Sequence, residues 1–215
     1  MSRERTLLFY LIILCGLLIV TSIHPFDRTT WLMEVAPVLI VLPILALTYR
    51  TFPLTPLLYL LLFLHAIILI SGGAYTYARV PLGFWVQDLF ALGRNNYDRL
   101  GHFFQGLVPA LLMREILLRL GYVTNRRMAA FLAICVAMAI SAWYEFIEWA
   151  AAVILGQKAD DFLGTQGDPW DTQWDMFMCF IGAVVAMVGL TREQDRQIEG
   201  MGDLASRVIA ERAED

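Results

Sequence analysis

The segment Ser141-Ala-Trp-Tyr-Glu-Phe-Ile-Glu-Trp149 carries two acidic side chains within a run of residues that is apolar enough to lie in a membrane. Ser141, Glu145 and Glu148 are separated by four and then three positions, a spacing that places all three on one face of an α-helix. Ionisable side chains at membrane depth are costly, so they indicate a functional site by default. The segment therefore predicts a membrane-spanning helix and marks where binding or chemistry takes place.

Two further segments repeat this pattern of polar residues at helical spacing beside apolar sequence. The first places three polar side chains on one helical face: Asp98, His102 and Gln105. The second forms a stripe that runs into the last apolar stretch: Asp168, Asp171, Asp175, Cys179 and Gly182. In the topology proposed below, all three polar groups begin or end their helices at the same depth, so we expect them to meet near the outer membrane interface.

Composition places the chain among polytopic membrane proteins. Of its 215 residues 59% are hydrophobic and only 17% are charged, whereas ordinary soluble domains are about 25% charged. The apolar residues come in long runs, which predicts an all-α protein that crosses the membrane several times. A net charge of −4 without a basic stripe or tail argues against a nucleic-acid partner.

Six apolar runs are each long enough to cross roughly 30 Å of hydrocarbon. They are Thr6–Ile23, Trp31–Tyr49, Leu54–Ser71, Asp98–Leu120, Met128–Leu155 and Thr172–Leu190. Residues 1–190 are thus predicted to form one six-helix transmembrane domain, and residues 191–215 a charged cytoplasmic tail. At the far end of the fourth run, we expect the side chains of Arg114, Glu115 and Arg119 to snorkel towards the interface.

The long connection over residues 72–97 is rich in glycine and aromatic residues. We interpret the glycine pair Gly72-Gly73 as a turn signal only. Phe84–Leu92 predicts a short interfacial helix between the third and fourth spans, because Trp and Tyr prefer the membrane–water boundary. We expect this connection to cover the site as a lid.

Arginine placement predicts the orientation. Six spans put both termini on one side of the membrane, and that side carries Arg3, Arg5, Arg50, Arg119, Arg126, Arg127, Arg192 and Arg196. The other side carries Arg28, Arg79, Arg94, Arg99 and Lys158. Because cytoplasmic loops are enriched in Lys and Arg, we expect both termini to be cytoplasmic.

Carboxylate oxygens beside one imidazole are a donor set that could bind a divalent metal, which could then assist catalysis. The metal ligands of this hypothesis are His102, Glu145, Glu148 and Asp175. The residues expected to act in catalysis are Asp98, His102, Glu145, Glu148, Asp171 and Asp175. Those expected to bind substrate are Arg94, Arg99, Gln105 and Asp168, with the two arginines gripping a phosphate.

Two other interpretations stay open. Clustered carboxylates beside a histidine can share protons, which is how proton-coupled transporters carry them. Alternatively, Asp98, Arg99, Glu145, Glu148 and Asp175 pair with one another and only fix helix register in a structural or partner-binding protein.

The chain resembles the YjdF-like family of uncharacterised bacterial inner-membrane proteins. The resemblance rests on Arg94-Asn-x-Tyr-Asp-Arg-x-Gly-His102-Phe, Tyr144-Glu-x-x-Glu-Trp149 and Gly167-Asp-x-Trp-Asp-x-Gln-Trp-Asp-Met176. It implies a six-helix inner-membrane protein, without an established activity. More distantly the pattern is similar to VanZ-like proteins, although Glu148 stands where that family has Gln and Cys179 where it has Asn.

Taken with the residues, these resemblances favour a protein of the bacterial inner membrane with a lipid as its partner. We expect it to bind, or to process with the help of a metal, a cell-envelope lipid or its headgroup. A small proton-coupled transporter is the main alternative function.

Overall fold

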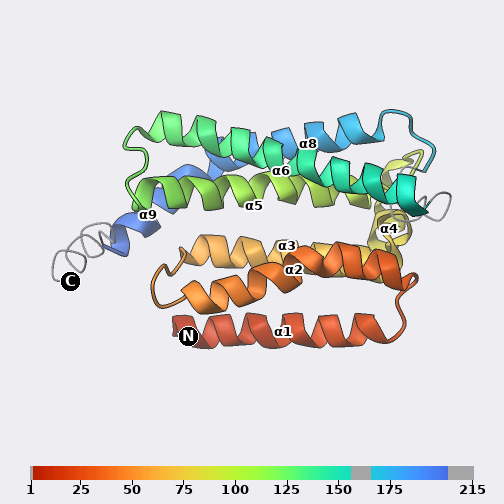
Figure 1. Cartoon of the computed structure of the whole chain (residues 1–215), viewed down its shortest axis with the longest axis horizontal. Helices are drawn as coiled ribbons and strands as arrows, with labels where there is room; N and C mark the ends of the chain where they lie inside the picture. Colours follow the sequence, from red (N-terminus) through yellow and green to blue (C-terminus); the bar gives the residue numbers. More distant parts are fainter. Residues whose placement is uncertain (1, 156–165, 203–215) are drawn as a thin grey trace.

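The computed structural model describes residues 2–155 and 166–202, which form a bundle of long α-helices (Figure 1). The elements in chain order are α1 (Arg3–Ile23), α2 (Arg28–Thr48), α3 (Pro56–Tyr75), the 3-10 turn η1 (Tyr77–Arg79), α4 (Pro81–Phe90), α5 (Tyr97–Arg119), α6 (Arg126–Leu155), α8 (Asp171–Val185), the π-helical turn η3 (Ala186–Leu190) and α9 (Thr191–Gly200). None of the described residues lies in a β-strand. The predicted all-α fold is confirmed.

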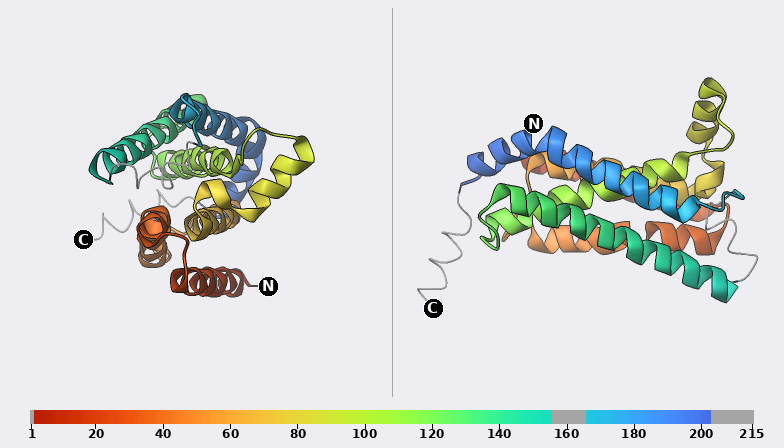
Figure 2. Two further views of the ribbon diagram at one scale, coloured as in Figure 1. Left: turned by 90° about the vertical axis from the view of Figure 1, so that its right-hand side faces the viewer. Right: turned by 90° about the horizontal axis from the view of Figure 1, so that it is seen from above.

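Five helices have the length and composition to cross a membrane: Arg3–Ile23, Arg28–Thr48, Pro56–Tyr75, Arg126–Ile154 and Asp171–Gly200. Helix α5 is as long, but it carries charged residues near both ends. It nevertheless runs the length of the bundle and packs against α3, α6 and α8 (Figures 1 and 2). The sixth crossing, by α5, stays a prediction.

The chain enters and leaves the bundle at the same end. The start of α1 and the end of α9 both lie there, opposite the end that carries α4 (Figure 1). This arrangement suits an even number of crossings. Which end faces the cytoplasm stays a prediction, as does the domain boundary at residue 190.

The predicted interfacial helix corresponds to α4, which projects from the bundle (Figure 2). It begins with Pro81 at its first position, where a missing N–H costs nothing. It exposes large apolar side chains, among them Trp85 at 64% and Phe90 at 67%. These exposed side chains are typical of a helix that lies at a membrane surface.

The glycine pair Gly72-Gly73 does not make a turn, so the sequence interpretation was wrong here. Both residues lie inside α3. A Cβ atom on Gly72 would lie 2.5 Å from the ring of Tyr77, and one on Gly73 would lie 3.1 Å from the Cβ of Glu34. The missing side chains let η1 and α2 approach α3 closely, so these glycines are packing positions.

Close backbone contact also joins α5 to α8. A Cβ atom on Gly106 would lie 1.8 Å from the carbonyl oxygen of Cys179, and one on Gly182 would lie 1.9 Å from that of Phe103. Small residues allow helices in a membrane to approach in this way. The contact sets the depth of α8 against α5 and thereby positions the polar residues one turn away.

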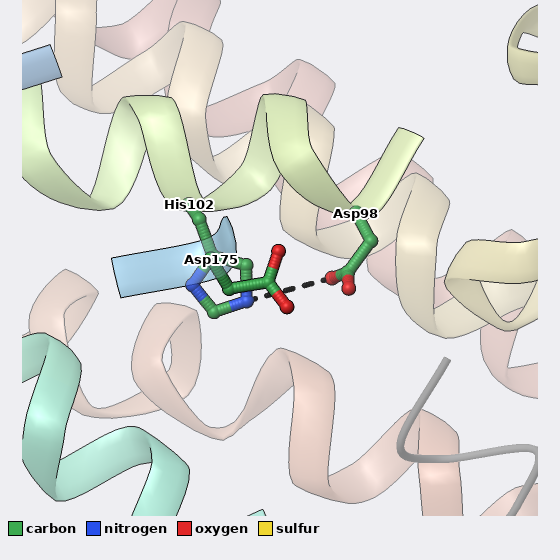
Figure 3. Close-up of side chains that lie close together, drawn as sticks. All are labelled: Asp98, His102 and Asp175. Atoms are coloured by element: carbon green, nitrogen blue, oxygen red, sulfur yellow. Dashed lines mark ion pairs between the residues drawn. The ribbon is translucent and has the colours of Figure 1, made fainter. Parts of the chain in front are cut away.

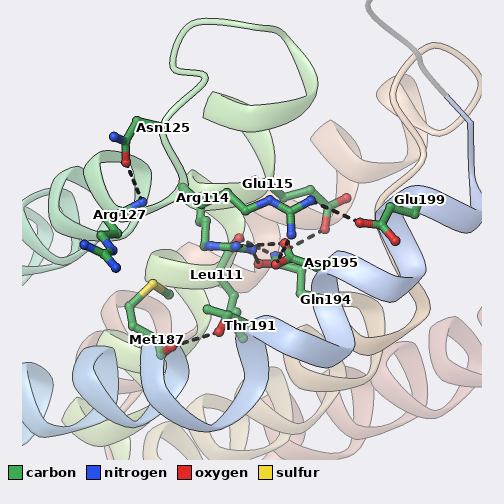
Figure 4. Close-up of polar contacts among 11 residues, drawn as sticks. Leu111, Arg114, Glu115, Asn125, Arg127, Met187, Thr191, Gln194, Asp195 and Glu199 are labelled. Atoms are coloured by element: carbon green, nitrogen blue, oxygen red, sulfur yellow. Dashed lines mark hydrogen bonds and ion pairs between the residues drawn. The ribbon is translucent and has the colours of Figure 1, made fainter.

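The expectation that Arg114, Glu115 and Arg119 snorkel was wrong, since at most 6% of each residue is exposed. Arg114 donates hydrogen bonds of 2.7 Å to Gln194 and to Asp195 of α9 (Figure 4). Arg119 donates to Glu115, also at 2.7 Å. Arg114 and Glu115 turn inwards because α9, which continues from α8 and packs against α3 and α5, supplies partners for both. Arg119 also donates to the backbone carbonyl of Pro53.

Candidate functional site

Asp98 and His102 of α5 lie beside Asp175 of α8 (Figure 3). One potential ligand atom of each residue lies within 4.8 Å of the other two. The Nε2 atom of His102 is 3.6 Å from a carboxylate oxygen of Asp98. All three residues are buried, with at most 7% of their surface exposed. We call Asp98, His102 and Asp175 the triad.

The amide of Gln105 orients the histidine of the triad. The Nδ1 atom of His102 lies 3.0 Å from Oε1 of Gln105. Because that oxygen can only accept, the contact favours the tautomer in which Nδ1 carries the proton and Nε2 presents a lone pair. This lone pair lies beside the Asp98 carboxylate. Two electron-rich groups side by side favour a cation between them, either a proton or a metal.

Two buried carboxylate oxygens beside the histidine have no hydrogen-bond partner in the described part of the chain. They are Oδ1 of Asp175 and Oε1 of Glu145, and the latter lies 4.0 Å from Nδ1 of His102. A buried polar atom without a partner is costly and calls for an explanation. A cation bound between these residues would supply the missing interaction.

The two arginines predicted to bind substrate form ion pairs in this structure, and their role in substrate binding stays a prediction. Arg94 lies 2.6 Å from Asp171, and Asp168 accepts from Arg94 at 3.4 Å and from Arg99 at 3.1 Å. The guanidinium of Arg99 also lies over the ring of Trp174, 5.1 Å from its centroid. These contacts tie the start of α5 to the start of α8 and so help to position the triad.

A cavity of about 300 Å³ adjoins the triad between α2, α3, α5 and α6. Its lining includes residues of the predicted site: Asp98, His102, Gln105 and Glu148. Its polar lining also includes residues that the sequence analysis did not assign to the site: Glu34, His65, Tyr77 and Tyr144. The remaining wall is formed largely by aliphatic side chains and two prolines.

Glu34 is the most consequential of the unassigned residues. It lies in α2 with 1% of its surface exposed, and Tyr144 of α6 donates a hydrogen bond of 2.9 Å to its Oε2 atom. Burial, and next the charge of Glu34, raise the pKa of Tyr77 well above its ordinary value, so the Tyr77 hydroxyl stays neutral. An acid within an apolar run was a usable signal for Glu34, but its pairing with Tyr144 was not visible from the sequence.

The structure brings together only part of the predicted site. Asp98, His102 and Asp175 meet directly, with Glu145 adjacent. Glu148 faces the cavity and does not join the triad among the described residues. Asp168 and Asp171 are held by arginines. The predicted ligand set of His102, Glu145, Glu148 and Asp175 stays a prediction, and the geometry adds Asp98 as a candidate ligand.

These features define an α-helical integral membrane protein with an acidic, histidine-containing site inside its bundle. The chain belongs to the family described as "Predicted membrane protein (DUF2238)", which matches residues 6–196. It is 61% identical over 186 residues to "Inner membrane protein YjdF" of Escherichia coli (strain K12), covering 86% of this chain and 89% of that protein. No solved structure matches the chain. It is therefore an integral inner-membrane protein of a family without an assigned activity.

Proposed function

We propose that the protein binds a cell-envelope lipid, or its headgroup, in the cavity beside the triad, and processes it with the help of a divalent metal. The observation that carries the proposal is the triad itself. Three potential ligand atoms from two helices lie within 4.8 Å of one another. Beside His102, oxygens of Asp175 and Glu145 are buried and have no hydrogen-bond partner among the described residues.

The donor set fits a divalent metal. Two carboxylates and one imidazole suit Zn²⁺, Mn²⁺ or Fe²⁺, and carboxylates with water suit Mg²⁺. Gln105 fixes the histidine tautomer that leaves Nε2 free to bind, which is the usual role of a second partner. A bound metal would polarise a phosphoryl or acyl oxygen, or lower the pKa of water. Glu145 is the adjacent carboxylate that could receive a proton.

The cavity supports a lipid as the ligand. Its aliphatic wall includes Val41, Leu62 and Leu112, while Asp98 and His102 lie on its polar side. This division matches a molecule with an apolar chain and a polar headgroup. The distant resemblance to VanZ-like proteins points to the same envelope role, and it remains a resemblance.

Proton-coupled transport is the second candidate. It is favoured by Glu34, an acid that is 99% buried in the bundle and whose carboxylate faces the same internal cavity as Asp98 and Glu148. Buried carboxylates in a membrane bundle are the groups that carry protons in transporters. The transporter reading requires uptake that depends on the proton gradient, which a metal-assisted enzyme does not.

The experiment is to reconstitute the purified protein into nanodiscs made from inner-membrane lipid extract. Lipids are then compared by mass spectrometry with and without added Mn²⁺ or Zn²⁺. We expect a metal-dependent lipid product with the native chain and none with His102→Ala or Asp175→Asn. Exposed His24 and Asp88 provide the matched controls His24→Ala and Asp88→Asn. A product of equal yield from all variants would contradict the proposal.

A further inference from the structure

Carboxylates are the most numerous ionisable groups in the lining of the cavity. Among the described residues that line it, the ionisable groups are three carboxylates and two histidines: Glu34, Asp98, Glu148, His65 and His102. None of these described lining residues is a lysine or an arginine. Nearby Arg94 and Arg99 are engaged with Asp168 and Asp171 beside the triad. Carboxylates in such a lining attract a cation.

Lining residues outside the triad offer the acceptors that an ammonium group needs. Glu34 accepts from Tyr144, and as a carboxylate it retains further acceptor sites. His65 Nε2 is buried and has no hydrogen-bond partner among the described residues. A primary ammonium has three donors, which the carboxylates of Glu34 and Glu148 and the ring nitrogen of His65 could receive.

Aromatic rings in the cavity lining also favour a cationic ligand. Tyr77 and Tyr144 both line the cavity, and the electron-rich faces of tyrosine rings attract ammonium groups. Asp98 adds a carboxylate that is 93% buried and accepts no hydrogen bond from the described residues, its nearest partner being His102 at 3.6 Å. The cavity thus combines carboxylates, rings and an apolar wall, the elements that would recognise an alkylammonium.

We infer that the ligand of this cavity is an amphipathic primary amine, whose ammonium group binds at Glu34 and Glu148 and whose chain lies against Val41, Leu62 and Leu112. The inference deepens the proposed function, since it names the headgroup chemistry of the ligand at the same cavity. A cavity of about 300 Å³ is at the small end for organic ligands. It therefore suits one chain or one headgroup rather than a whole two-chain lipid.

The test measures binding of decylammonium to the full-length protein in a non-ionic detergent by isothermal titration calorimetry. Decanol and decyl phosphate are the comparison probes with the same chain. We expect decylammonium to bind at least tenfold more tightly than either. Glu34→Gln and Glu148→Gln should each lower its affinity at least tenfold and leave decanol unchanged. Asp88→Asn, at an exposed position of α4, should leave all three affinities unchanged.

Equal affinity for decanol and decylammonium, or full retention of ammonium binding by both glutamine variants, would overturn the inference. Both variants keep the size of the native side chain, and thermal unfolding verifies that each is folded. The same samples are analysed for metal, because Glu34 lies outside the triad. Metal-free native protein that still prefers decylammonium would overturn only the metal part of the proposed function.

A nanodisc experiment distinguishes the two possible sources of the ammonium group, a lipid headgroup and a free amphipathic amine. Discs of phosphatidylethanolamine place a primary ammonium headgroup beside the protein. Discs of phosphatidylcholine have the same net charge but carry no ammonium N–H donor. Weaker decylammonium binding in the first discs would identify a lipid headgroup as the ligand. Equal binding in both would identify a free amphipathic amine.

Discussion

Gly106 of α5 lies so close to Cys179 of α8 that a Cβ atom added to Gly106 would be 1.8 Å from the Cys179 carbonyl oxygen. His102 lies one helical turn from Gly106, and Asp175 one turn from Cys179. The backbone contact therefore determines how near the histidine and the carboxylate come. The geometry of the site therefore depends on Gly106, whose lack of a side chain permits the close contact.

Gly106→Ala is expected to force α5 and α8 apart. Overpacking of this kind costs roughly 1–3 kcal/mol of unfolding free energy, and we expect a lower unfolding temperature in detergent together with weaker metal binding. Gly16→Ala is the matched control, because nothing lies within 4 Å of a Cβ atom at that position of α1. Equal unfolding temperatures for the two variants would show that the contact is not tight.

Arg114→Ala is expected to destabilise the end of the bundle where α9 packs. Arg114 is only 2% exposed, and its loss removes the hydrogen bonds to Gln194 and Asp195. Because Asp195 is partly exposed and keeps its ion pair with Arg126, we expect a cost of about 1–3 kcal/mol. Arg196→Ala removes an exposed arginine from the same helix α9 and should leave the unfolding temperature unchanged. Thermal unfolding in detergent compares the two variants, and similar losses would count against the role of the buried network.

Gln105→Leu is expected to weaken metal binding without removing a ligand. The amide of Gln105 holds Nδ1 of His102 at 3.0 Å, and loss of such a partner typically costs 10–100-fold in metal affinity. Competition with a chromogenic chelator measures the affinity. Retention of native affinity would mean that another group sets the tautomer of His102.

Reporter fusions test the predicted orientation of the chain. We expect a fluorescent reporter joined after Gly202 to be active and alkaline phosphatase at the same position to be inactive, because arginine placement predicts cytoplasmic termini. A phosphatase inserted between Asp88 and Leu89 of α4 should be active. The reverse pattern would place the triad near the cytoplasmic face and exclude an outer-leaflet substrate.

The helices could be predicted because each apolar run is by itself long enough and hydrophobic enough to cross a membrane. The sequence also predicted that the polar faces of α5, α6 and α8 would meet, because the predicted topology places their polar residues at the same depth. The prediction of a turn at Gly72-Gly73 was wrong, because glycine is common both in turns and where two helices pack closely. The sequence around a glycine does not show which of the two applies, because that depends on the segments that pack against it.

The contact between Glu34 and Tyr144 in the cavity lining could not be predicted from residue spacing. Tyr144 donates to Glu34 from 110 positions away in the chain, and no local pattern encodes that contact. The inward orientation of Arg114 has the same origin, because its partner Asp195 belongs to the segment interpreted as a tail. Long-range helix packing sets both features.

Metal content of the purified protein is the most direct measurement of the central claim that the triad is a metal site. Elemental analysis of the native chain is compared with His102→Ala, Asp175→Asn and Glu145→Gln, and with the exposed control His24→Ala. We predict close to one divalent metal per chain in the native protein and in the control, and loss of that metal in His102→Ala and Asp175→Asn while both remain folded. Native protein without metal after supplementation, or metal retained by both triad variants, would contradict the claim.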